Sequence, residues 1–174
     1  MFRAMIIGPD KPIPTPFTCT SLKVLPEWID ANGHMNVAYY LKAFDLGFDT
    51  TYDALGMGYD LMDRQSASTM AAEMHITYQN ELLEGDPIRV ESRLIDFDAK
   101  RFHWFQTMHH AEKGFLAGTC EWMILFIDMT RRRVAAMPDD LAALMARVKQ
   151  AHDTLPPPPE LGRSISLKNK RRAV

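Results

Sequence analysis

The chain has 174 residues, of which 47% are hydrophobic, and this fits one globular domain with a sizeable core. Its formal net charge of −2 gives no global reason to expect nucleic acid or a membrane surface as a partner. The two cysteines lie far apart, and neither a signal peptide nor a run of 18 apolar residues occurs, so we expect a soluble cytoplasmic protein.

The chain is predicted to begin with an arm over residues 1–16. Pro12, Pro14 and Pro16 alternate there, which prevents a regular strand ladder and favours an extended path. Residues 17–25 are rich in strand-forming side chains and alternate loosely, which predicts a first strand that ends before Pro26.

A polar turn follows at residues 26–36 and holds an acid, a histidine, two amide side chains and a glycine. Directly after it, apolar side chains recur at helical spacing over residues 37–55, which predicts an amphipathic helix of about five turns. Asn36 is a suitable N-cap and Gly56 a suitable end. Because the first N–H groups of a helix favour negative charge, we interpret the turn as an active site.

Several further strands are predicted downstream, because strand-forming runs alternate with short turns. They cover residues 68–79, 88–98, 102–110 and 115–127, with a further short strand around 133–136. Connections this short favour antiparallel neighbours. The fold class is therefore α+β, with one long helix packed on a curved antiparallel sheet.

The strand at 115–127 is apolar on both faces, which indicates that both faces are covered. One helix can cover only one face of a sheet. A second subunit is the natural cover for the other face, so we predict a homo-oligomer.

The chain is predicted to end with a helix over residues 139–150 and a tail over 151–174. The domain proper therefore spans residues 17–150. The tail contains a polyproline run at 156–159, followed by Glu160 and then by basic residues from Arg163 on without a further acid. It is either a solvated tail or a basic arm that contacts an anionic ligand or partner.

The motif DANGHMN at residues 30–36, leading into YYL at 39–41, resembles the signature of hotdog-fold thioesterases of the 4-hydroxybenzoyl-CoA thioesterase type. The likeness continues at residues 76–78 and 84–86 and covers roughly residues 17–140. The segment WIDANGHMNVAYY at residues 28–40, together with the turn DAKRFH at 98–103, resembles the thioesterases of carnitine and betaine breakdown within that family.

The resemblance implies a hotdog fold, in which five antiparallel strands wrap around a central helix. It also implies an acyl-CoA substrate and a homodimer or homotetramer. Two copies would join edge to edge into a continuous sheet, with the active sites at the subunit interface.

Thioester hydrolysis needs a nucleophile or base and donors for the developing oxyanion. Asp30 is the candidate carboxylate, either attacking the thioester carbon or activating a water. Backbone N–H groups near Gly33 to Asn36 are the candidate oxyanion donors. The alternative for Asp30 is a loop carboxylate that bonds only its own backbone.

The remaining candidate residues in the turn could also have purely structural roles. His34 is assigned to catalysis as a helper of Asp30, or else it packs the turn. Asn32, Gly33, Asn36 and Tyr39 are assigned to substrate binding, although the two asparagines also suit plain turn and cap roles.

A second candidate region lies in the turn that contains Lys100 and Arg101. Such a basic pair suits the phosphates of coenzyme A, although it also suits a solvated hairpin. His103 is a candidate to meet the Asp30 turn of a partner subunit. Glu73 and Glu121 are weaker candidates for additional acids.

The six histidines form no ligand pattern and no nucleotide-binding fingerprint occurs, so no metal and no cofactor are predicted. Three tryptophans and two tyrosines are candidates for an aromatic cage around a quaternary ammonium, although core packing also explains them. The alternative functions are a non-catalytic acyl-CoA-binding protein and an acyl-CoA hydratase or dehydratase on the same scaffold.

Overall fold

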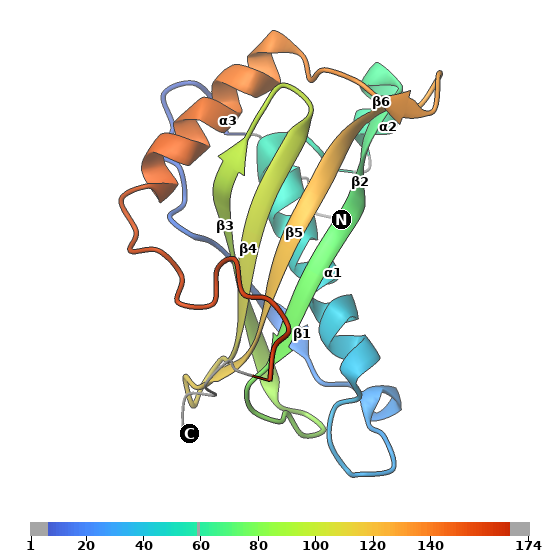
Figure 1. The fold of residues 1–174 in the computed structure, drawn as a ribbon, viewed down its shortest axis with the longest axis vertical. Coiled ribbons are helices and arrows are strands. Elements are labelled where there is room, and N and C mark those ends of the chain that lie inside the picture. The colour runs from blue at the N-terminus through green and yellow to red at the C-terminus, as the bar shows by residue number, and fades with distance from the viewer. Residues whose placement is uncertain (1–6, 59, 168–174) are drawn as a thin grey trace.

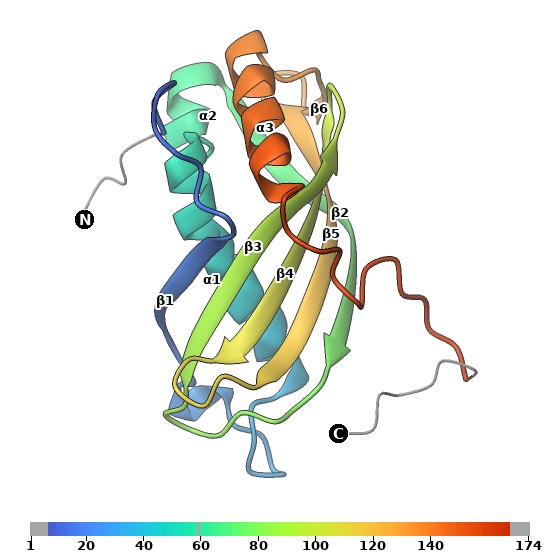
Figure 2. The same cartoon turned by 90° about the vertical axis from the view of Figure 1, so that its left-hand side faces the viewer.

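One curved antiparallel sheet wraps around a long central helix in the computed structural model, which describes residues 7–58 and 60–167 (Figures 1 and 2). The strands are β1 Phe17–Lys23, β2 Ala67–Tyr78, β3 Pro87–Phe97, β4 Arg101–His110, β5 Leu116–Asp128 and β6 Arg133–Val134. Their order is β1-β3-β4-β5-β2, with β6 added to β5. The helices are the 3-10 turn η1 Pro26–Trp28, α1 Val37–Leu55, α2 Asp60–Gln65 and α3 Asp139–His152.

Helix α1 has the bounds predicted from its caps. The Asn36 side chain accepts a hydrogen bond from the Ala38 amide at 3.0 Å, and Gly56 ends the helix in the left-handed conformation at φ 67°. Its buried face lies against the concave side of the sheet and comprises Tyr40, Ala43, Phe44, Gly47, Phe48, Thr51 and Leu55.

The buried amide of Gln106 fixes the helix on the sheet. Its nitrogen donates to the Phe44 carbonyl at 3.1 Å and to the Ser92 hydroxyl at 2.9 Å, and its oxygen accepts from the Trp122 indole at 2.8 Å. Gly47 allows this close approach, because a Cβ there would lie 2.5 Å from a Val90 methyl carbon. These contacts therefore fix the position of α1, and of the polar turn before it, relative to the strands.

Helix α3 covers part of the β3 edge that β1 leaves unpaired. The β1 ladder on β3 ends at the pair Phe17 and Ser92. Beyond it, the Leu94 amide donates to Nδ1 of the buried His152 at 2.8 Å, while Nε2 of His152 donates to the Pro14 carbonyl at 3.0 Å. The predicted arm and helix α3, which continues past its predicted end at residue 150, thus meet at His152.

Part of the predicted tail lies across the outer face of the sheet (Figure 1). The Arg93 guanidinium donates to the carbonyls of Leu155 and Pro156, and the Gly162 amide donates to a Glu121 carboxylate oxygen at 2.8 Å. This differs from a fully solvated tail. The basic residues at 168–174 lie outside the described residues.

Strand β2 forms an uncovered edge of the sheet. Its only strand partner in the described chain is β5. Three large apolar side chains on it are exposed, with exposed fractions of 40% for Met70, 40% for Met74 and 51% for Tyr78. Long, apolar, unpaired edges are surfaces where another chain adds a strand.

No helix within residues 7–58 and 60–167 has the length and apolarity needed to cross a membrane.

Candidate functional site

The polar turn is a tight hairpin that is closed by its own backbone. Ile29 pairs with Met35, the Asp30 amide donates to the His34 carbonyl at 3.1 Å, and the Gly33 amide donates to the Asp30 carbonyl at 3.0 Å. Gly33 has a φ of 82°, which favours glycine at this position. The hairpin leads directly into the Asn36 cap of α1.

The Asp30 carboxylate is partly held and partly open. Its Oδ1 accepts a hydrogen bond from the Asn32 amide at 2.8 Å, so Asp30 does bond its own turn. Its Oδ2 has no partner among the described residues, and the side chain is 20% exposed. The carboxylate is therefore oriented by one oxygen and accessible through the other.

His34 lies beside Asp30 without a close contact. Its Nδ1 is 3.9 Å from Oδ1 of Asp30 and 3.4 Å from the Met35 carbonyl oxygen. The imidazole is about one third exposed, at 34%. His34 can approach a ligand at the turn, but it does not orient the carboxylate through a short hydrogen bond in this conformation.

The amide donors at the turn differ in part from those expected. Of the expected donors, the amides of Gly33, Met35 and Asn36 are occupied, because Met35 donates to the Leu82 carbonyl at 2.8 Å and Asn36 to that of Trp28 at 2.9 Å, whereas the His34 amide has no acceptor among the described residues. The Val37 amide, at the first position of α1, has no acceptor in the part of the chain that the structure describes. Sequence reasoning missed it, because it depends on which distant carbonyls occupy the other amides.

Aromatic side chains lie on both sides of the turn in the sequence. The Tyr40 hydroxyl donates to the Asn80 carbonyl at 3.0 Å, and burial raises the pKa of Tyr40 to about 12, so this phenol stays protonated. Tyr39 stacks on Trp28 with ring centroids 5.5 Å apart. Trp104 and Trp122 pack on Phe48 in the core, so they are not available for an aromatic cage.

The turn between β3 and β4, which holds Lys100 and leads into Arg101, lies at the other end of the sheet from the loop between η1 and α1, which holds Asp30 (Figures 1 and 2). Strand β3 separates the two ends, and its 11 residues correspond to more than about 30 Å. Arg101 donates from Nε to Asp98 at 2.8 Å, which raises the pKa of Arg101 and lowers the pKa of Asp98. The structure therefore does not bring this basic turn to Asp30 within one chain.

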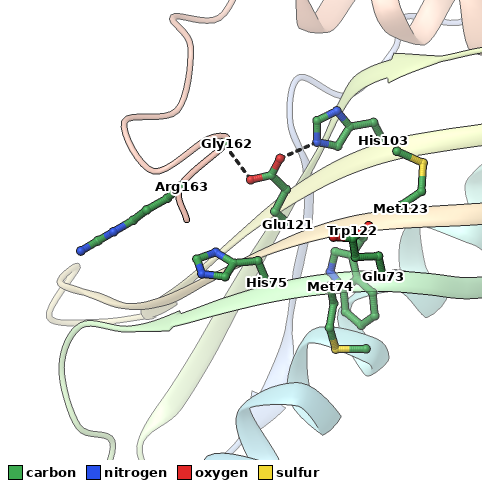
Figure 3. Close-up of a pocket in the computed structure, with 9 residues that line it drawn as sticks. All are labelled: Glu73, Met74, His75, His103, Glu121, Trp122, Met123, Gly162 and Arg163. Atoms are coloured by element: carbon green, nitrogen blue, oxygen red, sulfur yellow. Dashed lines mark hydrogen bonds and ion pairs between the residues drawn. The ribbon is translucent and has the colours of Figure 1, made fainter. Parts of the chain in front are cut away.

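His103 lies on the outer face of the sheet in a cavity of about 280 Å³ (Figure 3). Its Nε2 is 2.7 Å from one Glu121 carboxylate oxygen, and the Gly162 amide bonds the other. Glu73, His75 and Arg163 are the other polar side chains that line this cavity. The two predicted extra acids, Glu73 and Glu121, thus share one cavity, and Asp30 does not line it.

A second basic turn lies at the same end of the sheet as Lys100. Residues 131–133 are three consecutive exposed arginines, of which the first two lie in the connection between β5 and β6 and the third begins β6. Arg131 makes only a loose ion pair with Asp128, at 3.8 Å. The three consecutive arginines after a predicted strand are the signal that could have identified this turn.

Within the described residues, no group of three or more His, Cys, Asp or Glu side chains is arranged to hold a metal ion.

Comparisons with known proteins identify relatives over most of the chain. A family model described as the thioesterase-like superfamily matches residues 24–145. The chain is 31% identical over 144 residues to a betainyl-CoA thioesterase from Pseudomonas aeruginosa, covering 83% of this chain and 91% of that protein. It is 28% identical over 153 residues to an L-carnitine dehydrogenase/betainyl-CoA thioesterase from Rhizobium meliloti, covering 88% of this chain but only 31% of that longer protein.

Solved structures share the fold. A hypothetical protein from Staphylococcus aureus in complex with CoA has a TM-score of 0.80 and 31% identity, covering 94% of this chain and 98% of that one. A 1,4-dihydroxy-2-naphthoyl-CoA thioesterase from Synechocystis has a TM-score of 0.65 and 16% identity, covering 82% and 99%. At that identity the second likeness supports the fold alone. The predicted hotdog architecture is confirmed.

Proposed function

Because the chain belongs to the thioesterase-like superfamily, we propose that it hydrolyses acyl-CoA thioesters to a free carboxylate and coenzyme A. The predicted family and the general class, thioester hydrolase, are confirmed by this membership. One observation carries the finer proposal: a single tight turn presents an open carboxylate oxygen on Asp30 and an unoccupied helix amide on Val37.

Asp30 supplies the attacking oxygen or its base. In one route, Oδ2 attacks the thioester carbon, the carbon–sulfur bond breaks, the thiolate takes up a proton, and water then cleaves the resulting anhydride. In the other route, Oδ2 removes a proton from a water that attacks the same carbon, the carbon–sulfur bond breaks, and the thiolate takes up that proton. Both routes need the oriented carboxylate that the Asn32 amide holds at 2.8 Å.

The Val37 amide is the proposed donor to the thioester oxygen. It lies at the N-terminus of a helix with 19 residues, where the helix dipole favours the negative charge that develops on that oxygen. Asn36 caps the neighbouring amide and so leaves Val37 as the exposed donor. Asn32, Gly33 and Asn36 shape this turn, and the partly exposed His34 is proposed to contact substrate.

The coenzyme A phosphates are proposed to bind to basic residues of a second copy of the chain. If two β2 edges pair antiparallel about a twofold axis, the end of one subunit that carries Ala67 lies beside the end of the other that carries Tyr78. Lys100 and Arg101 lie at the Ala67 end and the Asp30 turn at the Tyr78 end. The pairing therefore brings the two halves of the proposed site together in a homodimer, alone or within a tetramer.

The acyl group is proposed to be small and cationic, as in betainyl-CoA. The support is the likeness to the Pseudomonas aeruginosa betainyl-CoA thioesterase, which extends over 83% of this chain. Tyr39 is the aromatic side chain nearest in sequence to the proposed oxyanion donor, and it is partly exposed. Its ring offers one face to a cation, because Trp28 covers the other.

A panel of CoA esters tests the proposed function. Thiol release is measured for betainyl, aromatic and short straight-chain acyl groups, with acyl-carrier-protein esters as a second thiol carrier. We expect hydrolysis, with the highest kcat/KM for the betainyl ester. Binding of every ester without thiol release would instead indicate an acyl-CoA-binding protein, and water addition to an enoyl-CoA would indicate a hydratase.

A further inference from the structure

A buried histidine at the end of β4 has hydrogen-bond partners that define its tautomer. His110 is 1% exposed. Its Nδ1 accepts the backbone amides of Glu112 at 3.2 Å and Lys113 at 3.1 Å, so that nitrogen carries no proton. Its Nε2 therefore carries the proton and donates it to Oδ1 of Asp86 at 3.2 Å.

Asp86 connects His110 to the loop between β2 and β3 by hydrogen bonds. Its Oδ2 accepts the Leu83 amide at 2.9 Å, and its own carbonyl accepts the Val24 amide at 3.0 Å. The Gly85 amide returns a bond to the Val24 carbonyl at 2.9 Å. The turn at residues 83–86 is thus tied both to β4 and to the segment that follows β1.

The same loop supports the Asp30 hairpin. Leu82, next to the anchored turn, is fully buried, and its carbonyl accepts the Met35 amide at 2.8 Å. Met35 is the residue that pairs with Ile29 to close the hairpin around Asp30. The end of β4 and the Asp30 hairpin lie at the same end of the sheet (Figure 2).

We propose that His110 and Asp86 are positioning residues. Through Leu82, this pair fixes the position of the Asp30 hairpin relative to the sheet. This inference rests on the proposed role of Asp30. His110 and Asp86 do not touch the substrate. They hold the loop whose carbonyl fixes Met35, and a displacement of about 1 Å in a reacting group can lower a rate by about 100-fold.

Steady-state kinetics of loop variants test the proposal. Asp86→Ala removes the acceptor for both His110 and Leu83, and we expect kcat per folded enzyme to fall by about 10- to 100-fold with a much smaller change in KM. Asp86→Asn keeps one acceptor for the His110 ring and should give an intermediate kcat. The matched control is His152→Ala, which removes another buried histidine, bonded to Leu94 and Pro14, and should lower the melting temperature while kcat stays at the wild-type value.

Hydrogen exchange at the Met35 amide gives a readout that does not depend on activity. We expect faster exchange there in Asp86→Asn and in Asp86→Ala, and wild-type exchange in His152→Ala. Wild-type kcat in folded Asp86→Ala, or unchanged Met35 exchange in both Asp86 variants, would overturn the positioning role. If the wild-type protein cleaves no thioester, the proposed function fails, and Met35 exchange still decides whether the pair holds the hairpin. Should Asp86→Ala not fold, Asp86→Asn alone decides through kcat and exchange.

Discussion

The Val37 amide is the proposed donor to the thioester oxygen at the start of α1. A proline at this position removes that N–H, and proline is tolerated at the first position of a helix because this donor has no intrahelical partner. Asn36 already has the extended conformation that a following proline requires, with φ −63° and ψ 144°.

We therefore predict that Val37→Pro lowers kcat by about 100- to 1,000-fold while the melting temperature changes little. The matched control is Asp139→Pro, which places proline at the first position of α3, after Pro138 in an extended conformation. Thiol-release kinetics and thermal unfolding of both variants check this. A folded Val37→Pro enzyme with wild-type kcat would remove Val37 from the oxyanion site.

Single residues also show where prediction from the sequence ends. Asn36 as a cap and Asp30 within a tight turn follow from local patterns, because their partners lie within two residues. The free Val37 amide does not follow from such a pattern. It depends on the Leu82 carbonyl, 47 positions after Met35, which occupies a neighbouring donor.

At the scale of elements, the contact between α1 and the sheet leaves no space at Gly47. A Cβ there would lie 2.5 Å from a Val90 methyl carbon and 2.9 Å from Val90 Cβ. We predict that Gly47→Ala lowers the free energy of unfolding by about 1–3 kcal/mol, although alanine favours helix by about 1 kcal/mol. Denaturant unfolding checks this, with exposed Thr50→Ala on the same helix as the control. Equal or greater stability in Gly47→Ala would contradict the close packing.

Helix and strand bounds were predictable to within a few residues, because caps and turns are local. Helix α1 matches its prediction over 37–55, and β5 covers Leu116–Asp128 where 115–127 was expected. The docking of the segment after α3 was not predictable. Its proline-rich, basic composition is typical of a solvated tail, while its anchors, Arg93 and Glu121, lie far away in the sequence.

His152 makes the docking of α3 sensitive to pH. Burial lowers the pKa of His152 from its ordinary value of 6.5, although the hydrogen bond to the Pro14 carbonyl acts in the opposite direction, and the ring accepts the Leu94 amide only while Nδ1 carries no proton. The unfolded chain therefore binds a proton at His152 more readily than the folded chain does. Its contribution to stability is fully present above pH 6.5 and is lost as the pH falls toward the folded-state pKa.

We predict that the free energy of unfolding decreases below this pH, with His152 contributing up to about 1.4 kcal/mol per pH unit. Denaturant unfolding between pH 8 and pH 5 measures this slope, and His152→Gln is the comparison because it cannot titrate. A variant with the same pH slope as the wild type would show that His152 does not contribute.

At the scale of the whole molecule, the β2 edge determines whether the proposed site is complete. The two exposed methionines there, Met70 and Met74, lie on a strand without an outer neighbour. We predict that the double variant Met70→Lys with Met74→Lys weakens self-association, because lysine on an edge strand disfavours pairing. Activity should fall with it, since the basic turns are proposed to come from the partner.

Analytical ultracentrifugation and kinetics over a range of protein concentrations check this prediction. Ile165→Lys is the control, because Ile165 is 94% exposed and lies outside the β2 edge. A monomeric double variant with wild-type kcat/KM would show that one chain holds the whole site. The separation of Lys100 from Asp30 was not predictable, because it depends on which strand ends carry which turns.

The turnover of Asp30→Asn tests the central claim most directly. Asparagine keeps the oxygen that accepts the Asn32 amide at 2.8 Å, so the hairpin should survive, while the nucleophile or base is lost. Asp153→Asn, at an exposed ion pair with Lys149, is the control. We predict that kcat of Asp30→Asn on the best CoA ester falls by about 100- to 10,000-fold with an unchanged melting temperature. Wild-type turnover in folded Asp30→Asn would contradict the account.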